Sequence, residues 1–157
     1  MPSLVVENRS LYLILLVVLG CLAFLSSGPG LTGSASVWHY HFFDSVCHQL
    51  PERSYSVNGV QMAVCSRCFG IYTSLFSGWL LMPLFVLLGL KKRKVLIRIF
   101  SIALGMNLID ILGNNFELWT NTLTSRMLMG ILFGLSITIL LGSDFFKQKR
   151  TGIYGSK

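Results

Sequence analysis

The stretch "GIYTSLFSGWLLMPLFVLLGLKKRKVLIRIFSIALGMNLIDILG", residues 70–113, consists of two long apolar runs joined by the basic segment "KKRK". An α-helix needs about 20 predominantly apolar residues to cross the hydrocarbon core of a bilayer, and each run approaches that length. Two more apolar runs lie on either side of this stretch. The sequence therefore predicts four membrane-spanning segments, at Leu11–Ser27, Gly70–Leu90, Val95–Gly113 and Met127–Leu141.

The composition excludes an ordinary soluble domain. Of the 157 residues, 53% are hydrophobic and only 12% are charged, too few charges to cover such a core. The runs are also too long and too uniformly apolar for the strands of a membrane barrel. We therefore predict an all-α fold with one membrane domain over residues 1–157. It would be a four-transmembrane-helix bundle with a structured outer loop at 28–69 and a short inner loop at 91–94.

The formal net charge of +7 is distributed unevenly along the chain. Most basic residues flank three predicted ends: Arg9 before the first span, Lys91, Lys92, Arg93, Lys94 and Arg98 around the second loop, and Lys147, Lys149, Arg150 and Lys157 after the fourth span. The positive-inside rule then places both termini and the "KKRK" loop in the cytoplasm, with the protein in the plasma membrane. The charge therefore indicates orientation and contact with the lipid bilayer, and we expect no nucleic-acid partner.

The segment "VLGC", Val18–Cys21, admits a second interpretation of the N-terminal run, because it resembles a lipoprotein cleavage box. Leucine before the glycine fits that box imperfectly, and the apolar run continues beyond Cys21. We therefore favour an uncleaved first span.

Small residues recur at four-residue spacing in three of the predicted spans, which is typical of close helix contacts in membranes. They are Gly70, Ser74 and Gly78 in the second span, Ser101 and Gly105 in the third, and Gly130, Gly134 and Thr138 in the fourth. We interpret them as packing seams. Pro83 lacks a backbone N–H and is expected to kink the second span.

Three of the four cysteines lie in or at the end of the predicted outer loop. Cys65 and Cys68 would stand at the outer mouth of the second span, where the helix dipole and Arg67 favour the thiolate form. Thiolate and imidazole ligands together suit Zn²⁺ or another soft transition metal. If the loop folds back over this span, Cys47, His48, Cys65 and Cys68 form the predicted metal site. Adjacent Cys47 and His48 can both be ligands only with a tight local turn, so the alternatives for the fourth position are another nearby histidine or a water that holds an open, catalytic position.

Further polar residues are expected at the same end of the bundle. They are Gln49, Arg53, Arg67 and Tyr72 near the cysteines, Asp110 in the third span, and Asn121 and Arg126 at the start of the fourth. We predict that they surround the metal or face a substrate, and that Asp110 is the candidate catalytic base if the site hydrolyses one. The structural alternative is an ion pair between Asp110 and Arg126 that only fastens the bundle.

Two other functions compete with a metal site. Cys65 and Cys68 form a C-x-x-C motif at a helix start, as in membrane thiol–disulfide oxidoreductases that pass electrons to a quinone. Such relays usually use two cysteine pairs, however, and the outer side offers three thiols. Alternatively, Arg53, Arg67 and Arg126 would hold a small anion or an anionic lipid headgroup. Transport would require a homo-oligomer, because four helices are too few for a transporter made of inverted repeats.

The segments "CHQLPERSY", "VCSRCFGIY", "LIDILG" and "TNTLTSRMLMGILFG" resemble the small prokaryotic membrane proteins of the domain of unknown function 2085 family. The matching positions are Cys47, His48, Gln49, Arg53, Ser54, Cys65, Arg67, Cys68, Gly70, Tyr72, Asp110, Asn121, Arg126 and Gly130. Phe69 departs from the small residue or threonine common in the family. The resemblance implies a bacterial or archaeal membrane protein in which these positions act as a unit, and it implies no particular activity or enzyme class.

Overall fold

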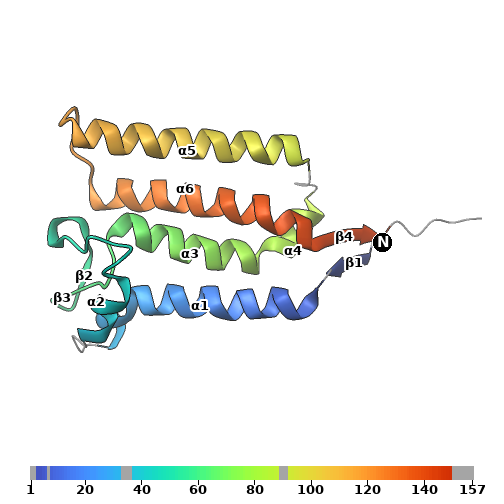
Figure 1. The fold of residues 1–157 in the computed structure, drawn as a ribbon, viewed down its shortest axis with the longest axis horizontal. Helices are drawn as coiled ribbons and strands as arrows, with labels where there is room; N and C mark the ends of the chain where they lie inside the picture. Colours follow the sequence, from blue (N-terminus) through green and yellow to red (C-terminus); the bar gives the residue numbers. More distant parts are fainter. Residues whose placement is uncertain (1–2, 7, 33–36, 89–91, 150–157) are drawn as a thin grey trace, which may run out of the picture.

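The computed structural model describes residues 3–6, 8–32, 37–88 and 92–149 (Figure 1). The helices are α1 Arg9–Thr32, α2 Val37–Phe43, α3 Ser66–Leu80, α4 Met82–Leu87, α5 Arg93–Asn115 and α6 Leu123–Gly142, with 3-10 turns at Pro51–Arg53 and Ser143–Phe145. The strands are β1 Ser3–Val6, β2 Ser56–Val57, β3 Val60–Gln61 and β4 Phe146–Lys149. The last two residues of the predicted second span, Lys91 of the basic loop, and Arg150 and Lys157 lie outside the described residues.

Among the described residues, three helices are long and apolar enough to cross a membrane: α1 over Arg9–Gly28, α5 and α6. Their bounds agree within a few residues with three of the predicted spans. Helix α1 continues through Cys21 without a break and extends to Thr32.

The predicted second span differs from the structure in both its start and its continuity. Helix α3 begins at Ser66, four residues before Gly70, and it stops at Leu80. Helix α4 follows from Met82, and Leu81 caps both helices. Pro83 lies in the first turn of α4, where its missing N–H leaves no helical hydrogen bond unmade. The expected kink is therefore a break between two helices. Helix α3 alone is too short to cross about 30 Å of hydrocarbon.

The four long elements lie side by side in the order α1, α3, α6, α5 (Figure 1). The main contacts join neighbours in this row, and those between α3 and α6 are the most extensive. The predicted bundle is thus a row of helices in which α3 and α6 occupy the centre.

The central pair meets along the predicted small-residue seam. A Cβ added at Gly70 would overlap the backbone carbonyl of Met127, and one added at Gly130 would overlap the carbonyl of Arg67. Further along, a Cβ at Gly78 would lie 3.1 Å from Thr138. The two helices can therefore approach backbone to backbone only because these positions lack side chains.

The seam predicted on the third span is wrong. Ser101 is exposed, and a Cβ at Gly105 would meet no atom within 4 Å. Helix α5 instead contacts α6 through Asn107, whose buried amide donates to the carbonyl oxygens of Ala103 at 3.0 Å and Met129 at 3.1 Å. A hydrogen bond thus joins α5 to α6, whereas α3 and α6 pack closely through small residues.

The two ends of the row have different characters. At one end β1 and β4 pair antiparallel, with Ser3 opposite Lys149 and Val6 opposite Phe146, which brings the two terminal segments together (Figure 1). At the other end lie α2, the β2–β3 hairpin, the start of α3 and the turn between α5 and α6 (Figure 1). The predicted site residues gather at this second end.

Candidate metal centre

The segment between α1 and α3 is folded onto the start of α3 by a small apolar core. Phe43, Cys47, Ala63 and Val64 are buried together, and Tyr72 packs against them with its ring centroid 5.6 Å from that of Phe43. The backbone N–H of Cys47 donates to the carbonyl of Phe43 at 2.9 Å, which continues the turn at the end of α2. Burial of Phe43 therefore fixes the position of Cys47, four residues further along.

Polar contacts hold the rest of the loop in place. The amide of Gln49 donates to the carbonyl of Tyr40 at 2.7 Å, and the Tyr40 hydroxyl donates to the carbonyl of Gln61 at 2.6 Å. The amide of Gln61 donates in turn to the carbonyl of Gln49 at 2.7 Å. This closed set of hydrogen bonds joins α2, the segment after Cys47 and the hairpin. Gln49, predicted to lie near a metal or substrate, thus also braces the loop.

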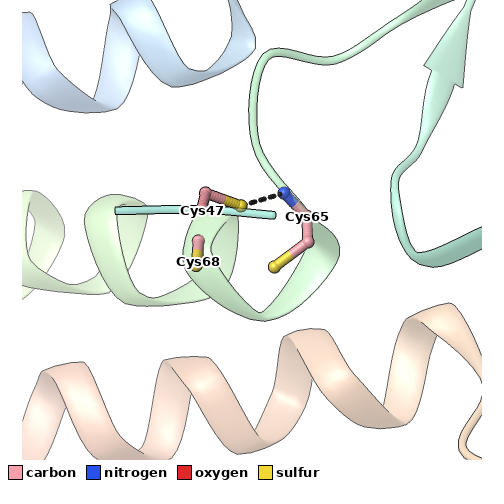
Figure 2. A group of neighbouring side chains, drawn as sticks. All are labelled: Cys47, Cys65 and Cys68. Carbon is pink, nitrogen blue, oxygen red and sulfur yellow. Dashed lines mark hydrogen bonds between the residues drawn. The ribbon is translucent and has the colours of Figure 1, made fainter. Parts of the chain in front are cut away.

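Three cysteine sulfurs meet where this loop covers α3. The Sγ atoms of Cys47, Cys65 and Cys68 lie within 4.8 Å of one another, and none of the three is in a disulfide (Figure 2). Cys65 is the N-cap of α3 and Cys68 lies in its first turn, so both sulfurs face the same side. The folding-back on which a shared site depends is therefore present.

The cluster favours a thiolate at Cys47. The backbone N–H of Cys65 donates to Cys47 Sγ at 3.1 Å (Figure 2). Hydrogen bonds from the thiols of Cys65 and then Cys68 lower the pKa of Cys47 to about 2, although burial acts in the opposite direction. Thiolate is the form that binds metals and attacks disulfides.

His48 is exposed on the wall of the cavity beside the sulfurs. Within the described chain, the group of metal-ligating atoms that come this close consists of the three sulfurs. His48 as a ligand therefore stays a prediction.

Arg67 and Asp110 form an ion pair between α3 and α5. Asp110 is buried, with 7% of its surface exposed. The structural alternative predicted that Asp110 pairs with Arg126, and that partner is wrong. Arg126 instead donates from Nη2 to Asn114 Oδ1 at 3.0 Å. Asn114 was not among the predicted site residues, although it lies one helical turn after Asp110 on α5 and therefore on the same face.

Two adjoining cavities open at this end of the helices. One has a volume of about 320 Å³ and contains the three cysteines, His48 and Gln49 on its walls. The other, of about 270 Å³, lies toward the α5–α6 turn and is lined by Asn114, Asn115 and Glu117. Both cavities are bordered by Arg53, Arg67, Ile111 and Arg126.

Asn121 closes the turn beside the second cavity. Its backbone N–H donates to Asn114 Oδ1 at 3.3 Å, the same oxygen that accepts from Arg126. Its side-chain Nδ2 is buried and has no hydrogen-bond partner among the residues that the structure describes. Asn121 thus lies at the site end, as predicted, and shares the acceptor Asn114 Oδ1 with Arg126.

The family model "Predicted membrane protein (DUF2085)" matches residues 47–140. The chain belongs to this family. The match begins at Cys47 and runs nearly to the end of α6, so the DUF2085 region contains the sulfur cluster, the three arginines and the central helix pair. Helices α1 and α2 precede it.

Archaeal proteins resemble parts of this DUF2085 chain. "Uncharacterized protein MJ1492" of Methanocaldococcus jannaschii is 46% identical over 48 residues, which is 31% of this chain and 31% of that protein. An "Uncharacterized protein" of Methanothermobacter thermautotrophicus is 47% identical over 38 residues, which is 24% of this chain and 34% of that protein. The chain thus spans about a third of the length of each relative. No solved structure matches.

Proposed function

We propose that this DUF2085 protein binds a transition metal ion, with zinc as the first choice, through Cys47, Cys65 and Cys68. The observation that carries the proposal is the approach of the three sulfurs, from two separate chain segments, to within 4.8 Å of one another. Thiolate ligands suit Zn²⁺, Cu(I) and iron–sulfur chemistry, whereas Mg²⁺ and Ca²⁺ prefer oxygen.

The remaining ligand position decides what such a metal would do. A structural zinc site has four protein ligands, whereas a catalytic site keeps one position for water or substrate. His48 as fourth ligand would make the site structural. With water in that position, the metal would lower the pKa of the bound water and supply a nucleophile for hydrolysis.

Asp110 serves the site better as a partner of Arg67 than as a base. Its carboxylate is buried and paired with the guanidinium of Arg67, which lies between Cys65 and Cys68 in the first turn of α3. Removing this carboxylate would therefore disturb Arg67 before it changed any proton transfer.

We infer that the metal site faces the outside of the cell. The described terminal strands lie at the opposite end of the helices from the cysteines (Figure 1). The basic residues near the termini and the α4–α5 connection favour a cytoplasmic location for that end. Helices α3 and α4 together would then supply the fourth crossing.

Thiol–disulfide exchange is the second candidate. Cys65 at the helix start and Cys47 with its lowered pKa supply an attacking thiolate close to a second thiol. Oxidation of the Cys47 thiolate and a second thiol to a disulfide would release two electrons and one proton. A membrane quinone would accept these and take one further proton from water as it becomes a quinol.

The two candidates are separated by metal analysis of protein purified without chelators. We expect about one zinc or similar ion per chain, lost in Cys47→Ser and Cys68→Ser and retained in Cys21→Ser. Cys21 is the matched control because it is exposed on α1 and outside the cluster. Metal-free protein with three intact thiols would overturn the metal proposal, and a disulfide that quinone regenerates after reduction would replace it with the redox one.

A further inference from the structure

Three arginines from three separate segments converge beside the sulfur cluster. Arg53 ends a 3-10 turn of the outer loop, Arg67 lies in the first turn of α3, and Arg126 lies near the start of α6. All three line both adjoining cavities. Like charges repel, so folding that places three guanidinium groups on common walls favours a ligand of opposite charge.

The carboxylates of the chain do not occupy these arginines fully. Among the described residues, the salt bridge at this site is the one between Arg67 and Asp110. Glu117 is exposed on the wall of the second cavity and makes no ion pair with a described residue. Three guanidinium groups therefore line these cavities, near two carboxylates and the Cys47 thiolate, and among the described residues only Arg67 is paired with a carboxylate.

Many guanidinium donors also remain available. Arg126 donates from one nitrogen to Asn114, and Arg53 has no side-chain hydrogen bond to a described residue. The Nε of Arg67 is buried and has no partner in the described structure. A buried N–H normally has a hydrogen-bond acceptor, and a bound oxyanion would supply one where the protein does not.

From these observations we propose that the cavities bind a phosphate group through Arg53, Arg67 and Arg126. Guanidinium groups bind phosphate oxygens through paired, parallel N–H donors, which makes arginine the preferred residue for this ligand. This inference rests on the proposed metal function, because it names the class of ligand that the same site would bind. An anion held by the arginines would lie beside the sulfurs and the open metal position.

The space suits a phosphate with an organic substituent. The cavity beside the sulfurs, about 320 Å³, also has apolar walls made by Val46, Leu50 and Ile111. A phospholipid headgroup would reach this end of the helices from the membrane surface, and a soluble phosphate would enter from the aqueous side. Both sources present the same phosphate oxygens to the arginines.

The test measures binding of two probes to the full chain. Inorganic phosphate is titrated into detergent-solubilised protein, and separately the protein is placed in nanodiscs of phosphatidylcholine with and without phosphatidic acid. Binding is read from the ³¹P NMR signal and from the shift in thermal unfolding temperature. Binding of free phosphate indicates a soluble ligand, and a response confined to phosphatidic acid indicates a lipid headgroup.

The variants are Arg53→Gln and Arg126→Gln, with Arg98→Gln as the matched control because Arg98 is exposed on α5 away from both cavities. We expect each site variant to weaken binding at least tenfold and the control to leave it unchanged. Equal binding by all variants, or binding of neither probe by wild type, would overturn the proposal. Circular dichroism confirms that each variant is folded.

Metal content is measured on the same samples, and Cys47→Ser is titrated beside wild type. Wild type that carries no metal when purified without chelators, yet binds phosphate, would overturn the metal proposal and support this one. Phosphate binding retained by metal-free Cys47→Ser would show that the arginines bind phosphate without the metal. Metal-loaded protein that binds no phosphate would overturn this proposal alone.

Discussion

Gly70 on α3 and Gly130 on α6 each lie against the backbone of the opposite helix, Gly70 against the carbonyl of Met127 and Gly130 against that of Arg67. The contact includes Arg67, in the first turn of α3, and Met127, the residue after Arg126 on α6. It therefore fixes the distance between the backbone segments that carry Arg67 and Arg126, near the starts of α3 and α6.

This reciprocal contact predicts that Gly70→Ala and Gly130→Ala are destabilising. Each added methyl would overlap backbone, which cannot rotate away as a side chain can, and overpacking of this kind costs about 1–3 kcal/mol. Unfolding in mixed detergent micelles measures the loss. Gly105→Ala is the matched control, because it lies within α5 where an added Cβ meets open space. Equal stability of the three variants would contradict the seam.

The seam could be predicted from sequence because four-residue spacing maps directly onto one helix face. The same rule failed for Ser101 and Gly105, since spacing identifies a face without showing what lies opposite it. The fold of the segment between α1 and α3 was harder to predict from sequence. The approach of Cys47 to Cys65 depends on burial of Phe43, and no local sequence pattern encodes that burial. The β2–β3 hairpin was predictable, because Asn58-Gly59 is a strong turn signal, but it was not predicted. Both residues have positive φ, 53° and 79°.

Asp110→Asn is predicted to destabilise the protein by about 3 kcal/mol, because removing one partner of a buried ion pair leaves the other charge uncompensated. The measurement is the free energy of unfolding of Asp110→Asn, Arg67→Gln and the double variant. We expect the double variant to lose less than the sum of the single losses, since the two residues interact. Strict additivity would mean that the ion pair contributes nothing.

The lowered pKa of Cys47 predicts a pH dependence for the metal-free protein. Its folded-state pKa of about 2 lies below the value of about 8.5 for an unfolded thiol, so between these values the unfolded chain binds the extra proton. Stability should therefore rise with pH across this window and decline on acidification. The unfolding temperature of chelator-treated protein, measured from pH 5 to pH 8, should show this slope. Cys47→Ser should reduce it, and Cys21→Ser should not.

The sidedness of the site is predicted from charge and from the position of the termini. Single cysteines introduced by Glu117→Cys, in the exposed α5–α6 turn, and by Lys92→Cys, beside the basic loop, lie at opposite ends of α5. A membrane-impermeant maleimide applied to intact cells should label the first variant and leave the second unlabelled until the cells are opened. The parent protein gives the background from the native cysteines, of which Cys47 is buried. The reverse pattern would place the thiols in the cytoplasm. Reducing conditions there favour metal binding over a stable disulfide, so the quinone-linked relay would lose the oxidising compartment that it requires.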